Sequence, residues 1–177
     1  MSPYLPINDL NIDFDKYLSM FSIPRRLIML TVSCPDCIND FILSKGMTIL
    51  KTHLFVTPPG INKGVALHVD YPNLGQCVPK LNWAHPDGEL VWYQPNRSNL
   101  NNKLHLTQLG EDYLKVDPTD AVELARYRVP NKTTLIDAGI PHCLEYNGTS
   151  ARISLSIFLH YKNRLPTWEE ATTLLTN

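Results

Sequence analysis

Short stretches of β-branched, aromatic and aliphatic residues recur along most of the chain, and Pro, Gly or Asn separates most of them. Each stretch has the length of one strand, and many short strands at near-regular spacing are typical of an antiparallel sandwich or barrel. The predicted strands lie at 26–32, 48–56, 64–68, 78–83, 89–93, 133–136, 142–146 and 152–161.

Other segments show helical spacing instead. Apolar residues in 34–44 share one face, and Lys45-Gly46 supplies an ending, which predicts a helix there. A threonine and a glutamate three residues later form a capping box near the start of a C-terminal helix that begins around 166. We also expect short helices at 13–21 and 118–127. The predicted fold class is therefore mainly β with flanking helices (α+β), an antiparallel sandwich or barrel.

No repeat, low-complexity tract or linker divides the chain, so we expect one domain over 1–177. Within it, 1–46 is predicted to be a helical and strand segment packed on the barrel. The β-rich barrel core is predicted over 47–161, and the C-terminal helix over 162–177.

Composition excludes some classes of function. Hydrophobic residues make up 44% of the chain and charged residues 19%, as in ordinary globular proteins. A net charge of -1 gives no general electrostatic basis for binding nucleic acid or membranes. Membrane spans and a signal peptide are not expected, because no apolar run is long enough and the N-terminus lacks the basic-then-apolar layout. With four cysteines, too few for a disulfide scaffold, we expect reduced thiols and a cytoplasmic location.

His68-Val69-Asp70 stands at the end of a predicted strand, where alternate residues point to the same side. One imidazole and one carboxylate suit iron, and a third ligand would complete a facial triad with open coordination positions. Alone, this pair is a weak signal and is more typical of a surface histidine near a turn, with Asp70 capping the loop at 71–73.

A second cluster of candidate residues lies nearer the C-terminus. His142 begins a predicted strand, and Arg152 follows ten residues later. Arg152, Ser154 and the next even-numbered positions alternate with an unbroken apolar set, so the two sets occupy opposite faces. An arginine directed into a barrel is costly without an anionic partner. We therefore predict a bound carboxylate paired with Arg152, to which Ser154 adds a hydroxyl.

Asn147-Gly148 indicates a hairpin turn between these two strands. If the loop has three or five residues, with Gly148 left-handed, His142 lies opposite Ser154. His142 and Arg152 then share the interior face about 7 Å apart, the separation a small dicarboxylate needs to chelate a metal and pair with the arginine.

The order and spacing of these residues resemble the Fe(II)/2-oxoglutarate-dependent oxygenases, whose pattern is His-x-Asp/Glu, a distal His and an Arg about ten residues later, often as Arg-x-Ser. The stretch Lys80-Leu81-Asn82-Trp83, followed by Trp92-Tyr93, is similar to strands of short bacterial and phage members. The resemblance covers residues 48–160.

The resemblance implies a double-stranded β-helix, which is a jelly-roll or cupin-like barrel. It also implies oxidative decarboxylation of 2-oxoglutarate to succinate, coupled to hydroxylation of a C–H bond. Iron would be bound by His68, Asp70 and His142, which are then also the catalytic residues. Arg152 would bind the far carboxylate of 2-oxoglutarate with Ser154, and Asn82 would contact the near one. O2 is the other co-substrate. The primary substrate is left open among a protein side chain, an amino acid, a nucleobase and a metabolite.

Three alternatives stay open. One is a non-catalytic jelly-roll protein with a binding or structural role, such as those associated with phages. Another is a cupin-like metalloenzyme without 2-oxoglutarate. The third is a thioredoxin-like redox protein, because Cys34-Pro35-Asp36-Cys37 lies between an apolar strand and a helix; a zinc site using Cys34, Cys37 and Cys77 or Cys143 is a lesser variant. His53 is expected to be a satisfied core or barrel residue.

Overall fold

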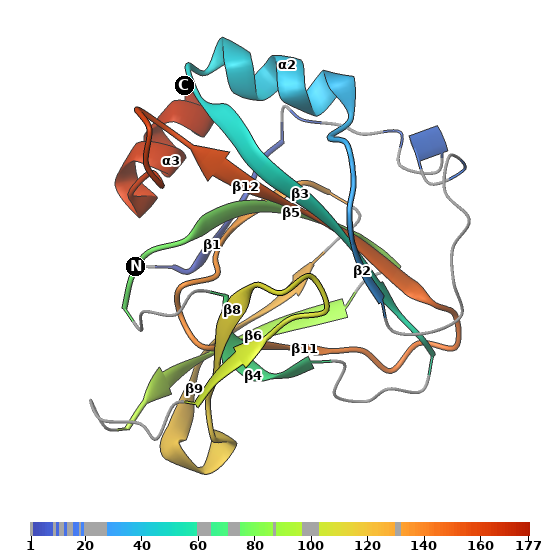
Figure 1. Ribbon diagram of the computed structural model, residues 1–177, viewed down its shortest axis with the longest axis vertical. Coiled ribbons are helices and arrows are strands. Elements are labelled where there is room, and N and C mark those ends of the chain that lie inside the picture. Colours follow the sequence, from blue (N-terminus) through green and yellow to red (C-terminus); the bar gives the residue numbers. More distant parts are fainter. Residues whose placement is uncertain are drawn as a thin grey trace.

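Two six-stranded antiparallel sheets form the body of the protein in the computed structural model (Figure 1). The structure describes residues 2–8, 10, 13, 16, 17, 19, 28–59, 65–70, 75–86, 88–96, 103–129 and 132–177. In order across the first sheet, the strands are β1 (Tyr4–Pro6), β10 (Thr134–Asp137), β5 (Pro79–His85), β12 (Arg152–His160), β3 (Thr48–Thr57) and β2 (Ile28–Thr31). Across the second sheet they are β7 (Lys103–Leu106), β8 (Asp112–Lys115), β4 (Val65–Val69), β11 (His142–Glu145), β6 (Gly88–Pro95) and β9 (Ala121–Val129).

The chain passes back and forth between the sheets: β3, β5, β10 and β12 belong to the first, and β4, β6, β9 and β11 to the second. This winding is that of a double-stranded β-helix, which confirms the predicted fold class. The first 46 residues add β1 and β2 to the first sheet. The domain boundaries at 46 and 162 stay predictions.

Strand β12 is buried along almost its whole length because both its faces are covered. Its odd-numbered apolar residues join the core beneath two helices, α2 (Asp36–Ser44) and α3 (Trp168–Thr176), which lie on the outer side of the first sheet (Figure 1). On the other face, Phe158 packs with Trp92 and Leu144 of the second sheet. The even-numbered positions of β12 therefore face the barrel interior, as the alternation predicts.

Local sequence signals fix the two helices. Thr167 accepts a hydrogen bond from the backbone of Glu170, whose side chain accepts one from the backbone of Thr167, so the predicted capping box is present. Helix α2 buries Ile38 and Ile42 and is followed by Gly46 at φ 72°. Among the described residues, no helix is both long enough and apolar enough to cross a bilayer.

Among the described residues, one predicted helix is absent, and two short strands of the second sheet appear that were not predicted. The helix expected at 118–127 is wrong: a 3-10 turn at Pro118–Asp120 leads into β9, which pairs with β6 along its length. Long-range strand pairing overrides the helical spacing of the alanines there. The short strands β7 and β8 were not predicted, because each has only four residues and the pattern is too short to indicate a strand. The helix expected at 13–21 lies largely outside the described residues.

The predicted hairpin between β11 and β12 is also wrong. These strands lie in different sheets, so the segment 146–151 is a crossover and His142 does not pair with Ser154. Gly148 is not left-handed. It is required for another reason: a Cβ atom there would lie 2.0 Å from the hydroxyl of Tyr146.

Candidate metal centre

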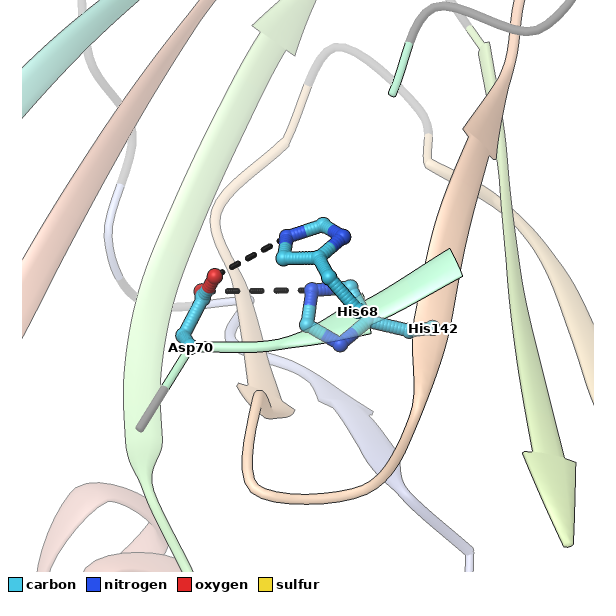
Figure 2. A group of neighbouring side chains, drawn as sticks. All are labelled: His68, Asp70 and His142. Atoms are coloured by element: carbon cyan, nitrogen blue, oxygen red, sulfur yellow. Dashed lines mark ion pairs between the residues drawn. The ribbon is translucent and has the colours of Figure 1, made fainter. Parts of the chain in front are cut away.

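Two adjacent strands of the second sheet bring three candidate ligands together. His68 of β4 and His142 of β11 are direct partners in the antiparallel register, and Asp70 follows the end of β4. One ligand atom from each of the three lies within 4.8 Å of the others. Figure 2 shows Asp70 facing both imidazole rings. Register thus brings together ligands more than seventy residues apart.

The carboxylate of Asp70 lies between the two rings. Its Oδ1 is 2.9 Å from Nε2 of His68, and its Oδ2 is 3.9 Å from Nε2 of His142 (Figure 2). The two ring centroids are 4.5 Å apart. Both Nε2 atoms and both carboxylate oxygens therefore converge on one small volume.

Backbone carbonyls set the orientation of both rings. Nδ1 of His68 is 2.8 Å from the oxygen of Ala66, and Nδ1 of His142 is 2.9 Å from the oxygen of Ile140. A carbonyl only accepts, so each Nδ1 carries the hydrogen and, in the neutral ring, each Nε2 carries a lone pair. Lone pairs that face a carboxylate repel it unless a proton or a metal cation lies between them. The donor set therefore fits a metal ion.

The electrostatics keep these groups in the forms that bind metals. Burial, with the charge of His68, lowers the pKa of His142 to about 4, so its ring is neutral at neutral pH. Burial opposes ionisation of Asp70, but Lys80 and the two histidines outweigh it and hold the pKa of Asp70 well below its usual range. Near neutral pH the site thus offers a carboxylate and at least one neutral imidazole.

Lys80 is the residue at this site that sequence reasoning missed. Its side chain is only 2% exposed, its Nζ donates to Oδ2 of Asp70, and it lies 3.8 Å from the centroid of the Phe158 ring. It reaches the site from β5, in the opposite sheet. The available signal was its phase: Lys80 alternates with Asn82 on a strand whose intervening residues are apolar.

The predicted co-substrate residues lie on the first sheet, opposite the strands that carry the two histidines. Arg152 is 3% exposed at the start of β12, and a Cβ atom at Gly88 would lie 2.7 Å from its Nε. Ser154 is buried on the same face of β12. Asn82 lies on the interior face of β5, and its buried Oδ1 has no hydrogen-bond partner among the described residues. A glycine thus makes room for the guanidinium beside other polar side chains.

Strand β6 relates the position of Arg152 to that of His142. Gly88, beside Arg152, is four residues along β6 from Trp92, the register partner of His142. That is about 13 Å of strand. An arginine side chain and a short dicarboxylate together span such a distance.

The cysteines show no sign of redox chemistry. All four are free thiols, and burial raises the pKa of Cys34 to about 12, which suppresses the reactive thiolate. The strands around Cys34 and Cys37 are antiparallel, whereas a thioredoxin-like domain requires βαβ units. No cysteine belongs to a metal-ligand group in the part of the chain that the structure describes.

Among the comparisons with known proteins, the one with solved structures finds similar folds. No protein-family model matches the sequence, and no curated protein matches it significantly. The solved non-haem α-ketoglutarate-dependent carbocyclase SnoK from nogalamycin biosynthesis aligns over 97% of this chain and 86% of its own, with a TM-score of 0.50 and 10% identity.

Two weaker matches are EvdO2 from Micromonospora carbonacea var. aurantiaca, complexed with 2-oxoglutarate, and the apo form of the non-haem monooxygenase ThoJ. EvdO2 aligns over 77% of this chain and 68% of its own (TM-score 0.45, 15% identity). ThoJ aligns over 71% of this chain and 52% of its own (TM-score 0.40, 17% identity), so this chain spans about half of ThoJ. The similarity to SnoK shows that this chain shares the fold of that protein, a double-stranded β-helix, as its sequence predicts.

Proposed function

We propose that the protein is an Fe(II)- and 2-oxoglutarate-dependent oxygenase that hydroxylates its substrate, with His68, Asp70 and His142 as the metal ligands. One observation carries the proposal. In both imidazoles Nδ1 is hydrogen-bonded to a backbone carbonyl, which leaves the two Nε2 atoms directed at the same small volume as the Asp70 carboxylate. Two imidazoles and one carboxylate with open positions are the ligand set of non-haem Fe(II) oxygenases.

When bound, iron and 2-oxoglutarate supply the oxidative decarboxylation of the keto acid to succinate and carbon dioxide, coupled to hydroxylation of a C–H bond. The protein holds the co-substrate through Arg152, whose planar guanidinium suits a carboxylate. Ser154 and Asn82 lie on the same interior surface and add hydrogen bonds. The unpartnered oxygen of Asn82 supports a role for that residue in binding a polar molecule.

Lys80 acts on the metal site through Asp70. Because its ammonium binds Oδ2 of Asp70, Oδ1, the oxygen nearer His68, would be available to hold a metal. Hydrogen bonds of this kind orient metal ligands and are as much part of a site as the ligands themselves. Lys80 is therefore a positioning residue in the proposed mechanism.

Metal binding tests the proposal without knowledge of the substrate. Equilibrium dialysis against Co(II), a stand-in for Fe(II), should give one ion per chain, lost in His68→Ala and Asp70→Ala. The exposed His85 provides a control, because His85→Ala removes a histidine outside the site. Undiminished Co(II) binding in both ligand variants would sink the assignment and favour the non-catalytic jelly-roll alternative. A cytoplasmic location stays a prediction.

A further inference from the structure

A cavity of about 240 Å³ adjoins the proposed metal centre, and His68 and Asp70 form part of its wall. Residues of both sheets line it, and the β7–β8 hairpin contributes the rest of the wall. Any molecule bound there lies next to the metal ligands. The cavity is smaller than the roughly 300–1,000 Å³ typical of drug-sized ligands, so it suits a molecule the size of an amino acid or a single ring.

Most of the remaining wall is apolar or aromatic. Phe55 of β3 and Phe158 of β12 come from the first sheet, while Leu106 and Tyr113 come from the hairpin. Flat aromatic walls favour a compact apolar body. The apolar wall alone does not distinguish one such body from another.

His53 supplies a specific polar group in this wall. Its side chain is 1% exposed, its edge lies against Phe158 at a centroid distance of 5.2 Å, and neither ring nitrogen has a hydrogen bond among the described residues. Burial, partly opposed by Glu111, lowers the pKa of His53 to about 4, so the ring is neutral and one nitrogen is an acceptor. Buried polar groups normally have partners, and this one lines a cavity, which indicates a partner supplied by a ligand.

Glu111 influences which charge a ligand group can carry at this end of the cavity. Its Oε1 is 3.4 Å from Nε2 of His53 and 2.6 Å from Nζ of Lys51. Lys51 does not line the cavity, whereas Glu111 and Asp112 do. Lys80 also lines it, but its ammonium is paired with Asp70. A ligand carboxylate here would meet like charge, whereas an O–H or N–H donor would meet acceptors.

The hairpin tip that carries Glu111 is fixed in place. The amide of Thr107 donates to the oxygen of Glu111 at 2.8 Å, and the amide of Glu111 donates to the hydroxyl of Thr107 at 3.1 Å. The amide of Met29 in β2 donates to Oε1 of Gln108 at 3.0 Å. Glu111 is therefore presented to the cavity by a tip anchored to the first sheet.

We infer that this cavity is the substrate site and that the substrate is a compact small molecule with an apolar or aromatic body bearing an O–H or N–H donor, which His53 and Glu111 recognise. The identification of the cavity as a substrate site rests on the proposed oxygenase function. The donor preference rests only on the cavity itself.

Simple aromatic probes test the preference. Phenol, benzylamine, toluene and benzoate would be titrated into Co(II)-loaded protein labelled with ¹⁵N-histidine, and binding followed by NMR. One additional hydrogen bond is worth roughly threefold to tenfold in affinity, so phenol and benzylamine should bind that much more tightly than toluene, with benzoate weakest. The His53 ring nitrogens should shift with phenol, and Co(II) should broaden the signals of the bound probe.

Two variants locate the effect. His53→Phe should reduce the phenol preference to near unity, while Glu111→Gln, at a partly exposed position that folding tolerates, should reduce the benzylamine preference. His85→Phe is the matched control and should change neither. Equal binding of phenol and toluene, or an unchanged preference in both variants, overturns the inference even if Co(II) binds normally. A donor preference that persists in protein unable to bind Co(II) instead supports the ligand site while the oxygenase proposal fails.

Discussion

At the scale of single residues, the proposed metal centre consists of the ligand atoms that have no hydrogen bond to the described residues that surround them. Each imidazole commits Nδ1 to a carbonyl two residues earlier, and Asp70 commits one oxygen to Lys80. What is left, two Nε2 atoms and one carboxylate oxygen, makes up the metal-binding set. A buried lysine is the cationic partner of Asp70 in the metal-free protein.

Lys80→Met should destabilise the metal-free protein by on the order of 3 kcal/mol, because it leaves the Asp70 carboxylate without its buried partner. Co(II) would replace the lost cation, so the increase in melting temperature on adding Co(II) should be larger in this variant than in the unmodified protein. Calorimetry with and without metal measures both effects.

Lys51→Met is the matched control, since Lys51 lies 4.3 Å from the centroid of the same Phe158 ring but pairs with Glu111 in a half-buried setting. It should cost no more than about 1 kcal/mol. Equal effects of the two substitutions would contradict the role given to Lys80.

Arg152→Met should leave Co(II) binding intact and weaken 2-oxoglutarate binding by about 3 kcal/mol, because one half of a buried ion pair is lost. Gly88→Ala should weaken it in the same direction but less, since its new Cβ displaces the guanidinium. Isothermal titration calorimetry of the Co(II) protein measures both, with the exposed Arg128→Met as control. An unchanged affinity in Arg152→Met would place the anion elsewhere.

At the scale of elements, the turn between β10 and β11 connects the ligands. The buried carboxylate of Asp137 accepts hydrogen bonds from the amides of Val78 and Gly139, both at 2.9 Å. The next carbonyl, of Ala138, accepts from the amide of Asp70 at 3.1 Å. This turn therefore fixes the start of β11, with His142, relative to Asp70.

Asp137→Ala should lower the free energy of unfolding by about 2–4 kcal/mol, because two amides lose a charged acceptor in the interior. It should also weaken Co(II) binding, although Asp137 is not a ligand. Asp117→Ala removes an exposed carboxylate that likewise accepts from an amide at 2.9 Å, and it should leave metal binding unchanged. If both variants bind Co(II) like the unmodified protein, the turn does not position the site.

Elements differ in how far the sequence predicts them. Strands β3 and β12 follow from apolar alternation, and α3 follows from its capping box, because these signals are local. The failure at 118–127 arose where strand pairing decided the conformation. The hairpin expected at Asn147-Gly148 failed because a turn signal does not reveal whether the next strand continues the same sheet.

At the scale of the whole molecule, the two sheets contribute different residues to the proposed site. The three ligands come from the second sheet, whereas Lys80, Asn82 and Arg152 come from the first. The His-x-Asp spacing and the alternation of β12 were visible in the sequence, so the proximity of His68 to Asp70 and the interior position of Arg152 could be predicted. The contact between Lys80 and Asp70 could not, because it depends on how one sheet packs on the other.

The buried histidines should make the stability of the whole metal-free protein depend on pH. His53 and His142 have pKa values lowered to about 4, below the roughly 6.5 of an unfolded histidine. The unfolded chain therefore binds more protons between these values, and the free energy of unfolding should fall as pH drops from 6.5 towards 4. Urea denaturation between pH 7.5 and 4.5 measures the slope, which His53→Phe should reduce and His85→Phe should not. An identical slope in all three proteins would contradict the buried, neutral state of His53.

The most direct test of the central claim is an anaerobic titration of the protein with Fe(II) and 2-oxoglutarate, followed by visible absorbance. Chelation of iron by the keto acid should give a weak metal-to-ligand band that saturates at one iron and one 2-oxoglutarate per chain and is absent in His142→Ala. If the unmodified protein shows no band and binds neither iron nor 2-oxoglutarate, the oxygenase assignment is wrong and the barrel serves another purpose.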